Sequence, residues 1–224
     1  MLQDFNKIIS FCTCCKGRLW QLKHTLPHNI KYITKEIEII ILDYQSNDGL
    51  IEWLYDNYKT YIEDNRIKLI SLSSDEFVYN YSSAFAKNVC HKQAGGKVLM
   101  NLDCDQFIDH NTINDLINLP PNNLYIPQVT QKSSGQFGRL GYSKDLFYSL
   151  KGYDETLIGL KGDDTFLRIK TRKLNIQHTI ASSYYPCIEN TYEEKYRYVN
   201  LENGINPPLN YPSIWGEFPI YQHI

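Results

Sequence analysis

The chain has 224 residues, 42% of them hydrophobic, which is enough for one large α/β domain with a sizeable core. A formal net charge of −2 excludes the strongly basic footprint of a nucleic-acid-binding or membrane-surface protein. The sequence has no apolar run of the roughly 18 residues that a membrane span needs, and its start does not resemble a signal peptide. The composition predicts a soluble, cytoplasmic protein with no membrane span and no nucleic-acid partner.

The first half of the chain alternates apolar runs of strand length with stretches of helical spacing. Four apolar runs predict strands, at residues 7–12, 36–42, 67–70 and 97–102. Apolar side chains recur at helical spacing between them, around residues 19–26, 50–58 and 82–90. Pro27 is expected to end the first helix, and Gly95 and Gly96 the third. This alternation predicts βαβ units and a mostly parallel sheet.

The second half is less regular. Residues 124–129 and 137–142 are predicted as strands, and Ser143 is predicted to cap a short helix over residues 144–150. Residues 165–174 have helical spacing. Roughly the last forty residues are rich in Tyr, Asn and Pro, and we expect them to wrap the outside or to form a lid.

Six cysteines raise the question of a zinc site. Cys12, Cys14 and Cys15 form a cluster, but the sequence contains no Cys-x-x-Cys pair of the kind that structural zinc sites use. Reduced cysteines that pack as small, half-buried residues are the better interpretation.

Three acidic loops indicate where the protein could bind a ligand. Asp103 and Asp105 directly follow the strand at 97–102, the loop 43–48 follows the strand at 36–42, and Asp163–Asp164 precedes a helix. The carboxyl ends of parallel strands gather ligands at one edge of a sheet. Carboxylates concentrated there repel one another unless a cation compensates. A divalent metal with a nucleotide diphosphate would supply that compensation.

In order and spacing, these motifs resemble the GT-A fold glycosyltransferases of the broad family-2 type. Asp103-Cys104-Asp105 matches the D-x-D motif of that family, and residues 8–18 look like its first strand and nucleotide-binding loop. Residues 43–49 are similar to its D-x-x-S-x-D-G segment, and residues 80–88 to the helix that lies against the donor. The resemblance spans roughly residues 7–170.

A later block resembles the galactosyltransferase and N-acetylgalactosaminyltransferase branch of inverting enzymes. Gly152-Tyr153-Asp154-Glu155, Gly159 and residues 162–168 resemble its G-Y-D-E…G…E-D…R block, with three residues between Asp164 and Arg168. Two positions depart from it. Asp163 stands where the family has Glu, and Asn190 stands where many relatives place a metal-binding His.

The resemblance implies a single GT-A domain, with a Rossmann-like, mostly parallel sheet flanked by helices. Residues 1–110 would form the nucleotide-sugar-binding half, and residues 111–224 the half that binds the acceptor and carries the catalytic base. The implied activity is metal-dependent, inverting transfer of a sugar from a nucleotide-diphosphate donor, with UDP favoured, to a glycan or other hydroxyl acceptor.

The resemblance also assigns residues to roles. Asp164 would be the general base, with Asp163 beside it. Asp103 and Asp105 would bind Mn²⁺ or Mg²⁺, completed by His178, Glu189, Asn190 or water. The donor-binding residues would be Thr13, Arg18, Asp43, Gln45, Ser46, Asn80, Lys87 and Asp103.

Simpler interpretations and other classes of protein stay open. Asp43 could merely form a turn, and Asp163–Asp164 could merely stabilise a helix N-terminus. Arg18 and Lys87 could be solvated helix charges. A sugar-phosphate nucleotidyltransferase would normally show a Gly-rich phosphate loop after the first strand, whereas residues 13–18 contain one glycine. A relative that binds sugar nucleotide without catalysis is the other alternative.

Overall fold

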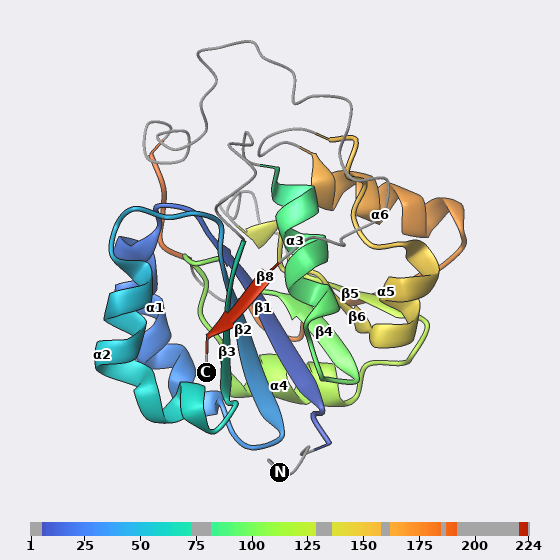
Figure 1. Cartoon of the computed structure of the whole chain (residues 1–224). Coiled ribbons are helices and arrows are strands. Elements are labelled where there is room, and N and C mark those ends of the chain that lie inside the picture. Colours follow the sequence, from blue (N-terminus) through green and yellow to red (C-terminus); the bar gives the residue numbers. More distant parts are fainter. Residues whose placement is uncertain are drawn as a thin grey trace.

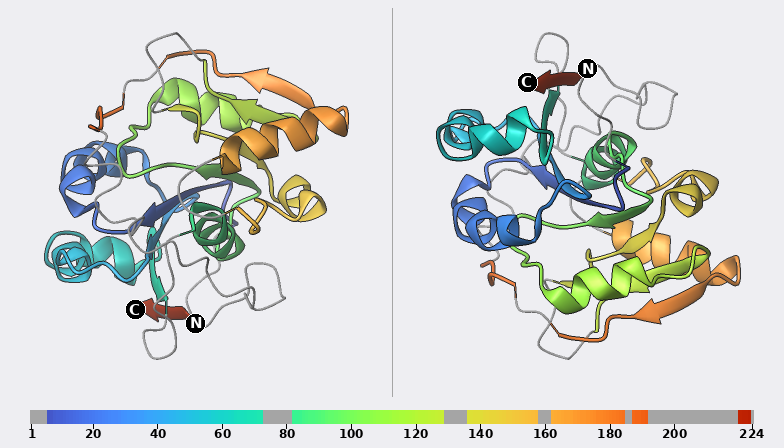
Figure 2. Two further views of the ribbon diagram at one scale, coloured as in Figure 1. Left: turned by 90° about the horizontal axis from the view of Figure 1, so that it is seen from above. Right: turned by 90° about the horizontal axis from the view of Figure 1, so that it is seen from below.

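In the computed structural model, the described residues are 6–72, 82–128, 136–157, 162–184, 187–191 and 220–223. They form an eight-stranded sheet with helices on both faces (Figure 1 and Figure 2). The strands are β1 (Ile9–Cys15), β2 (Ile37–Asp43), β3 (Ile67–Leu72), β4 (Val98–Asn101), β5 (Asn123–Ile126), β6 (Gly141–Ser143), β7 (Gln177–Ile180) and β8 (Ile220–His223). The helices are α1 (Leu19–Asn29), the 3-10 helix η1 (Ile30–Tyr32), α2 (Leu50–Glu63), α3 (Ser83–Lys92), α4 (His110–Ile117), α5 (Lys144–Leu150) and α6 (Asp163–Lys173).

The strand order is β7-β5-β6-β4-β1-β2-β3-β8, with a parallel centre. Strand β1 pairs in parallel with β2 and β4, and β2 pairs in parallel with β3. Strand β6 runs antiparallel to both β4 and β5, and β8 runs antiparallel to β3. The predicted α/β sheet flanked by helices is confirmed, with these antiparallel pairs making it a mixed sheet.

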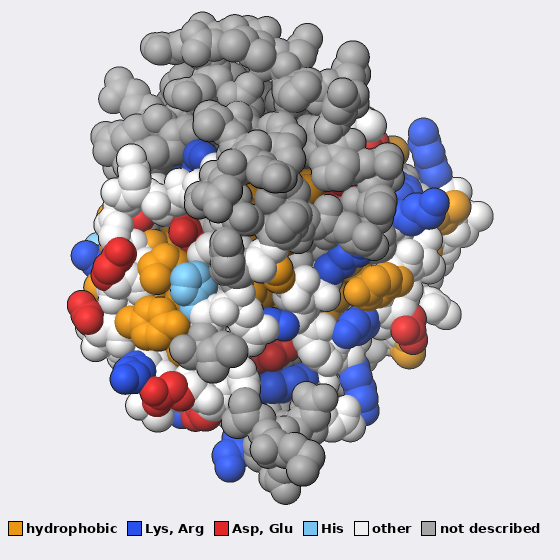
Figure 3. All heavy atoms as spheres, viewed as in Figure 1, with side chains coloured by type: hydrophobic (Ala, Val, Ile, Leu, Met, Phe, Trp, Pro, Cys, Tyr) orange, Lys and Arg blue, Asp and Glu red, His pale blue; other side chains and the backbone are white. Residues whose placement is uncertain are grey.

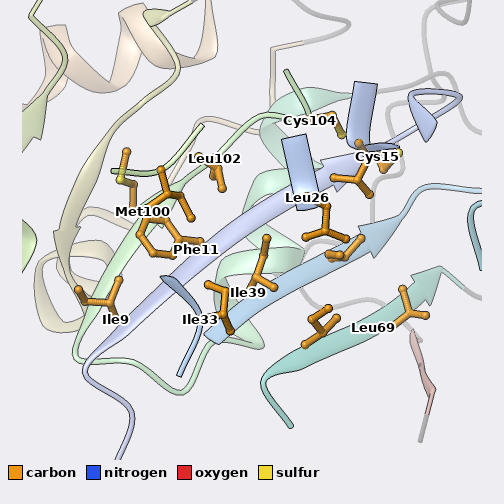
Figure 4. Packing of buried hydrophobic residues seen from close by; sticks show 14 of the residues in the cluster. Ile9, Phe11, Cys15, Leu26, Ile33, Ile39, Leu69, Met100, Leu102 and Cys104 are labelled. Carbon is orange, nitrogen blue, oxygen red and sulfur yellow. The ribbon is translucent and has the colours of Figure 1, made fainter. Parts of the chain in front are cut away.

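Strands β1 and β2 contribute side chains to two hydrophobic cores, one on each face of the sheet, because successive side chains of a strand point to opposite faces. Phe11 and Ile39 lie in a buried cluster with residues of α1, α2 and α4, part of which is shown in Figure 4. Cys12 and Ile40 lie in a second cluster with residues of α3, α5 and α6. Burial of both faces explains why these strands read as nearly continuous apolar runs.

Helix α1 continues through Pro27, so the prediction that Pro27 ends it is wrong. The last turn is fixed by tertiary contacts of Asn29, whose Nδ2 donates to Gln106 O at 3.0 Å and whose Oδ1 accepts from Ile108 N at 2.8 Å. These bonds hold the helix end where local sequence alone predicts a stop.

Several elements of the second half differ from the sequence prediction. Of the predicted strand at 137–142, only the last two residues lie in a strand, β6 (Gly141–Ser143). Helix α4 was not predicted, although Asp109 caps it by accepting from Thr112 N at 2.7 Å. Strands β7 and β8 were also missed, since they add to the sheet edges through contacts distant in sequence.

Three predictions from the sequence remain predictions. The expected wrap or lid falls mainly on residues 192–219, which lie outside the described residues. In the described part of the chain, no helix is both long and apolar enough to cross a bilayer. The cytoplasmic location and the division into halves at residue 110 stay predictions of the sequence.

Candidate active site

The carboxyl ends of β2, β1 and β4 lie side by side and define one edge of the sheet. Cys15, the last residue of β1, pairs with Asp43, the last residue of β2. On the other side of β1, Cys12 pairs with Asn101, the last residue of β4, and Asp103 follows two residues later. The parallel register therefore brings the first two acidic loops to the same edge, as the sequence predicts.

The loop after β2 is fixed by hydrogen bonds from backbone N–H groups to its own side chains. Asp43 Oδ1 accepts from Ser46 N at 2.9 Å, and Ser46 Oγ accepts from Gly17 N at 3.1 Å. Asp48 Oδ2 accepts from Leu19 N at the start of α1, at 2.9 Å. Burial raises the pKa of Asp43. The loop is thereby locked against the turn between β1 and α1.

Thr13, Gln45 and Asn80 were also predicted to bind the donor, and the structure describes the first two. Thr13 is buried, and its Oγ1 donates to Leu102 O at 2.8 Å, which ties β1 to β4. Gln45 adopts a left-handed conformation with φ 54° in the loop after β2. Asn80 lies outside the described residues. Thr13 therefore has a structural contact that the sequence did not reveal.

The Asp103 carboxylate is held by neighbouring amide groups. Asn101 Nδ2 donates to Asp103 Oδ1 at 3.0 Å, and Gln106 Nε2 donates to Asp103 Oδ2 at 3.3 Å. Gln106 Oε1 in turn accepts from Asp103 N at 3.1 Å. Because neutral amides make these contacts, they orient the carboxylate without neutralising it.

Gly138 lies between two of the three acidic clusters. A Cβ at this position would lie 2.6 Å from Asp103 Oδ2 and 3.2 Å from Asp164 Oδ2. The two carboxylates therefore face the same small space, which only a residue without a side chain leaves open. Sequence reasoning missed Gly138, because it falls in a segment predicted to be a plain strand.

Asp163 and Asp164 share a buried lysine from α3. Lys87 Nζ donates to Asp163 Oδ2 at 2.6 Å and to Asp164 Oδ1 at 2.7 Å. Burial disfavours the ammonium, but the two carboxylates hold the pKa of Lys87 well above its ordinary value. Lys87 is therefore a charged group at the heart of the site, and the solvated-lysine interpretation is wrong.

The two carboxylates differ in their protonation. Burial opposes ionisation of Asp163, but the charge of Lys87 prevails and lowers the Asp163 pKa. Burial raises the pKa of Asp164 to about 6, with the like charges of Asp163 and Asp103 acting against the attraction of Lys87. Asp164 is therefore the carboxylate of the pair that can exchange a proton near neutral pH.

Asp105 is held by a segment from far along the chain. Ile188 N donates to Asp105 O at 2.8 Å, and Asn190 Nδ2 donates to Asp105 Oδ2 at 2.6 Å. Asn190 Oδ1 accepts from Arg18 Nη1 at 3.2 Å and also from the Gln21 amide. Arg18 thus reaches the site through Asn190.

Asp105 also keeps one carboxylate oxygen, Oδ1, buried without a hydrogen-bond partner in the described part of the chain. Burial, followed by the charge of Asp103, raises the pKa of Asp105 to about 7. Leaving such an oxygen unsatisfied is costly, and a hard cation would satisfy it. The chemistry of Asp103 and Asp105 therefore fits a divalent metal ion.

His178 does not accompany these carboxylates. It lies on β7, and its Nε2 is 2.9 Å from Thr171 Oγ1 of α6. Strands β5 and β6 stand between β7 and β4 in the sheet. Within the described ranges, no three His, Cys, Asp or Glu side chains converge as a metal site. The side chain that contacts the Asp105 carboxylate is that of Asn190, not that of His178.

Comparison with solved structures identifies similar folds at low sequence identity. Residues 1–349 of S. aureus TarS, in complex with UDP-GlcNAc, match with a TM-score of 0.62 and 17% identity, over 80% of this chain and 57% of that one. A mannosyltransferase from Pyrobaculum calidifontis, in complex with GDP-Man and Mn²⁺, matches with a TM-score of 0.64 and 14% identity, over 87% of this chain and 60% of that protein.

The catalytic domain of Drosophila β1,4-galactosyltransferase 7, in complex with xylobiose, matches with a TM-score of 0.59 and 13% identity, over 84% of this chain and 74% of that domain. This chain spans less than two thirds of the length of TarS and of the mannosyltransferase. No protein-family model and no curated protein sequence matches it. The sheet, its flanking helices and these structural matches show that the chain has the fold of the GT-A glycosyltransferases.

Proposed function

We propose that the protein is a metal-dependent glycosyltransferase that moves a sugar from a nucleotide-diphosphate donor to an acceptor hydroxyl with inversion. The observation that carries this proposal is the pair of carboxylates, Asp103 and Asp164, that face one space at Gly138. One of them follows a central strand, and the other begins a helix and contacts a buried lysine. This arrangement supports a donor site and a general base within reach of one reacting centre.

Asp164 is the general base of the proposed reaction. Its Oδ1 is held by Lys87, while its Oδ2 faces Gly138. It would accept the proton of the acceptor hydroxyl as that oxygen attacks the anomeric carbon from the side opposite to the departing diphosphate. A base with a pKa of about 6 combines adequate basicity with ionisation at neutral pH. Lys87 and Asp163 fix its orientation.

Asp103 and Asp105 would hold Mn²⁺ or Mg²⁺. When bound, such an ion neutralises charge on the leaving diphosphate. Asn190, whose side chain contacts Asp105 at 2.6 Å, is the better third member of this site than His178. Its amide oxygen is a suitable ligand for a hard cation if the amide turns.

The donor is proposed to be a UDP-sugar whose base lies at the Asp43 loop. Asp43 is at the end of β2, next to the turn that begins α1, and its carboxylate can accept from a base N–H. Solved structures of similar fold carry UDP-GlcNAc, UDP-Gal or GDP-Man, so GDP-sugars belong in the same test. The acceptor is proposed to be a glycan or another hydroxyl compound.

The proposal is tested with a panel of UDP- and GDP-sugars, each with and without Mn²⁺. Binding is measured by thermal shift, because a ligand raises apparent stability by mass action. Donor hydrolysis and transfer are measured separately. Asp164→Asn is expected to keep donor binding and to lower turnover by about 10²–10⁴-fold. Asp56→Asn, at an exposed aspartate in the middle of α2 that belongs to none of the motifs, is the matched control and should change neither.

Absence of binding to every donor in both conditions would contradict the proposal. Donor binding with no turnover, or with turnover unaffected by Asp164→Asn, would instead indicate a protein that binds sugar nucleotides without catalysing transfer.

A further inference from the structure

Helix α6 carries a row of charged residues that begins at the proposed base. Asp164, Arg168 and Arg172 are spaced four residues apart, so they lie on one face of the helix. Leu167 and Thr171, one residue before the two arginines, are buried against the domain. The row therefore runs along the margin where α6 meets the rest of the molecule.

An aromatic ring lies beside this row. The Arg168 guanidinium carbon is 5.5 Å from the centroid of the Phe137 ring, and Phe137 is 41% exposed. Phe137 directly precedes Gly138, whose absent side chain leaves the space that Asp164 faces. An exposed aromatic face of this kind can stack on a sugar ring through its apolar side. A stacking surface and a guanidinium thus lie immediately next to the proposed base.

Among the described residues, the arginines of this row form no ion pair with a carboxylate, although the charge of Asp164 attracts Arg168. Asp164 itself is bonded to Lys87. Burial, followed by the like charge of Arg172, lowers the pKa of Arg168. Figure 3 shows Lys and Arg side chains over the region where Figure 1 places α6.

Helix stability alone does not explain Arg168. Arg172 and Lys173 lie in the last turn of α6, where cations interact favourably with the helix dipole. Arg168 is in the middle of the helix, beyond the reach of that effect, which falls off within one turn. Its partly buried position beside an aromatic ring is instead typical of a site that binds an anion.

The row leads away from the proposed nucleotide site. Asp43 follows β2, which is on one side of β1, whereas β4 and β6 are on the other side. Thr171 of α6 contacts His178 of β7, the strand at the far edge of the sheet on that side. Arg168 is therefore between the base and the edge opposite to the nucleotide, where the acceptor would enter.

We propose, resting on the function proposed above, that Phe137, Arg168 and Arg172 form an acceptor subsite for a saccharide that carries an anionic group. The acceptor ring stacks on Phe137, its reacting hydroxyl meets Asp164, and a carboxylate or phosphate meets the Arg168 guanidinium. Guanidinium groups bind either anion through two parallel hydrogen bonds. Four residues of helix rise about 6 Å, so the anion belongs to the acceptor sugar itself or to its direct neighbour.

The test uses the full chain and matched immobilised oligosaccharides that are neutral, contain a uronic acid, or carry a phosphate. We expect one anionic series to be bound about 10- to 100-fold more tightly than its neutral counterpart. Whichever anionic series binds identifies the source of the charge. Arg168→Gln should abolish the difference, and Arg168→Lys should retain part of it, because lysine keeps the charge without the planar fork. Lys173→Gln, which removes one charge from the same helix outside the row, should leave the difference unchanged.

Three results would overturn the subsite. These are equal binding of neutral and anionic saccharides, an equal loss from Arg168→Gln and Lys173→Gln, or a loss of UDP binding in Arg168→Gln with saccharide binding unchanged. Its failure is distinct from failure of the proposed transfer. Transfer that proceeds equally well with neutral and anionic saccharides would refute the subsite alone, and Arg168-dependent binding without any transfer would support the subsite and refute the proposed catalysis.

Discussion

The loop after β2 and the start of α6 are both acidic, yet they hold their carboxylates in opposite ways. In the loop, Asp43 and Asp48 accept hydrogen bonds from neutral backbone N–H groups, those of Ser46 and of Leu19 at the start of α1. At α6, Asp163 and Asp164 share the Nζ of Lys87, which comes from a helix 76 residues away in the sequence. Neutral donors fix a shape, whereas a buried cation also sets the protonation of its partners.

The two regions therefore differ in what their carboxylates can do. The loop carboxylates accept hydrogen bonds from the backbone and thereby fix the shape of the loop at the proposed nucleotide site. The pair at α6 divides one positive charge, so Asp163 stays ionised while Asp164 has a pKa of about 6. The same residue type is therefore held by neutral donors in one place and by a buried cation in the other, where it is the proposed proton acceptor.

Replacing the shared cation should have the largest effect. Lys87→Met leaves two buried carboxylates with no compensating charge, and we expect the free energy of unfolding to fall by about 3–5 kcal/mol. Denaturant unfolding monitored by circular dichroism measures the loss. Lys23→Met, at an exposed position of α1, is the control and should change stability by less than about 0.5 kcal/mol.

A substitution in the loop after β2 should cost much less stability. Ser46→Ala removes the acceptor of the Gly17 N–H, and we expect a cost of only about 1 kcal/mol. Equal losses for Lys87→Met and Ser46→Ala would show that the two acidic regions are held in the same way.

Filling the space at Gly138 should mainly affect the chemistry. In Gly138→Ala the new Cβ would lie 2.6 Å from Asp103 Oδ2, so that carboxylate must move. A displacement of about 1 Å at a reacting centre can lower turnover by about 10²-fold, and overpacking costs about 1–3 kcal/mol of stability. Transfer kinetics and thermal denaturation measure the two effects.

Gly95→Ala is the matched control, because its Cβ would approach Glu38 Oε1 at 3.2 Å, far from these carboxylates in the sheet. Unchanged turnover in Gly138→Ala would mean that Asp103 and Asp164 do not act on a common centre.

The pH dependence of turnover distinguishes the two members of the α6 pair. Asp164 must be ionised to act as a base, so turnover should rise with pH through about 6 and then level off. Asp163→Asn removes a like charge that raises the Asp164 pKa, so the rise should move to lower pH, by about one unit. A pH profile of kcat measures this shift, and a rise that moves to higher pH would contradict the assignment.

Short apolar runs were sufficient to predict the central strands β1 to β4, because strands buried on both faces leave that signal in the sequence. The acidic residues at their ends were predicted for the same reason. The partners of those residues were harder to predict from the sequence. Gly138, the Lys87 ion pair and the contact of Asn190 with Asp105 each join parts of the chain that are distant in sequence.

The edge strands β7 and β8 escaped prediction for a related reason, since their sequence patterns are short and half exposed. His178 is a further example. It is close in sequence to the position where the motif has a metal-binding His, but in the structure it lies on the edge strand β7 and not beside Asp105. Its Nε2 instead lies 2.9 Å from Thr171 Oγ1 of α6.

The smallest predicted effect concerns Thr13, which the motif resemblance assigns to donor binding and the structure places in a buried bond between β1 and β4. Thr13→Val keeps the shape but removes the hydroxyl that donates to Leu102 O. We expect a loss of about 1 kcal/mol in unfolding free energy, the net worth of one hydrogen bond plus an unsatisfied carbonyl. Donor affinity, measured by titration with UDP and Mn²⁺, should stay within about twofold. Because Leu102 precedes Asp103, a larger loss of affinity with unchanged stability would instead mean that the hydroxyl itself contacts the donor, and would place Thr13 with the chemistry rather than with the scaffold.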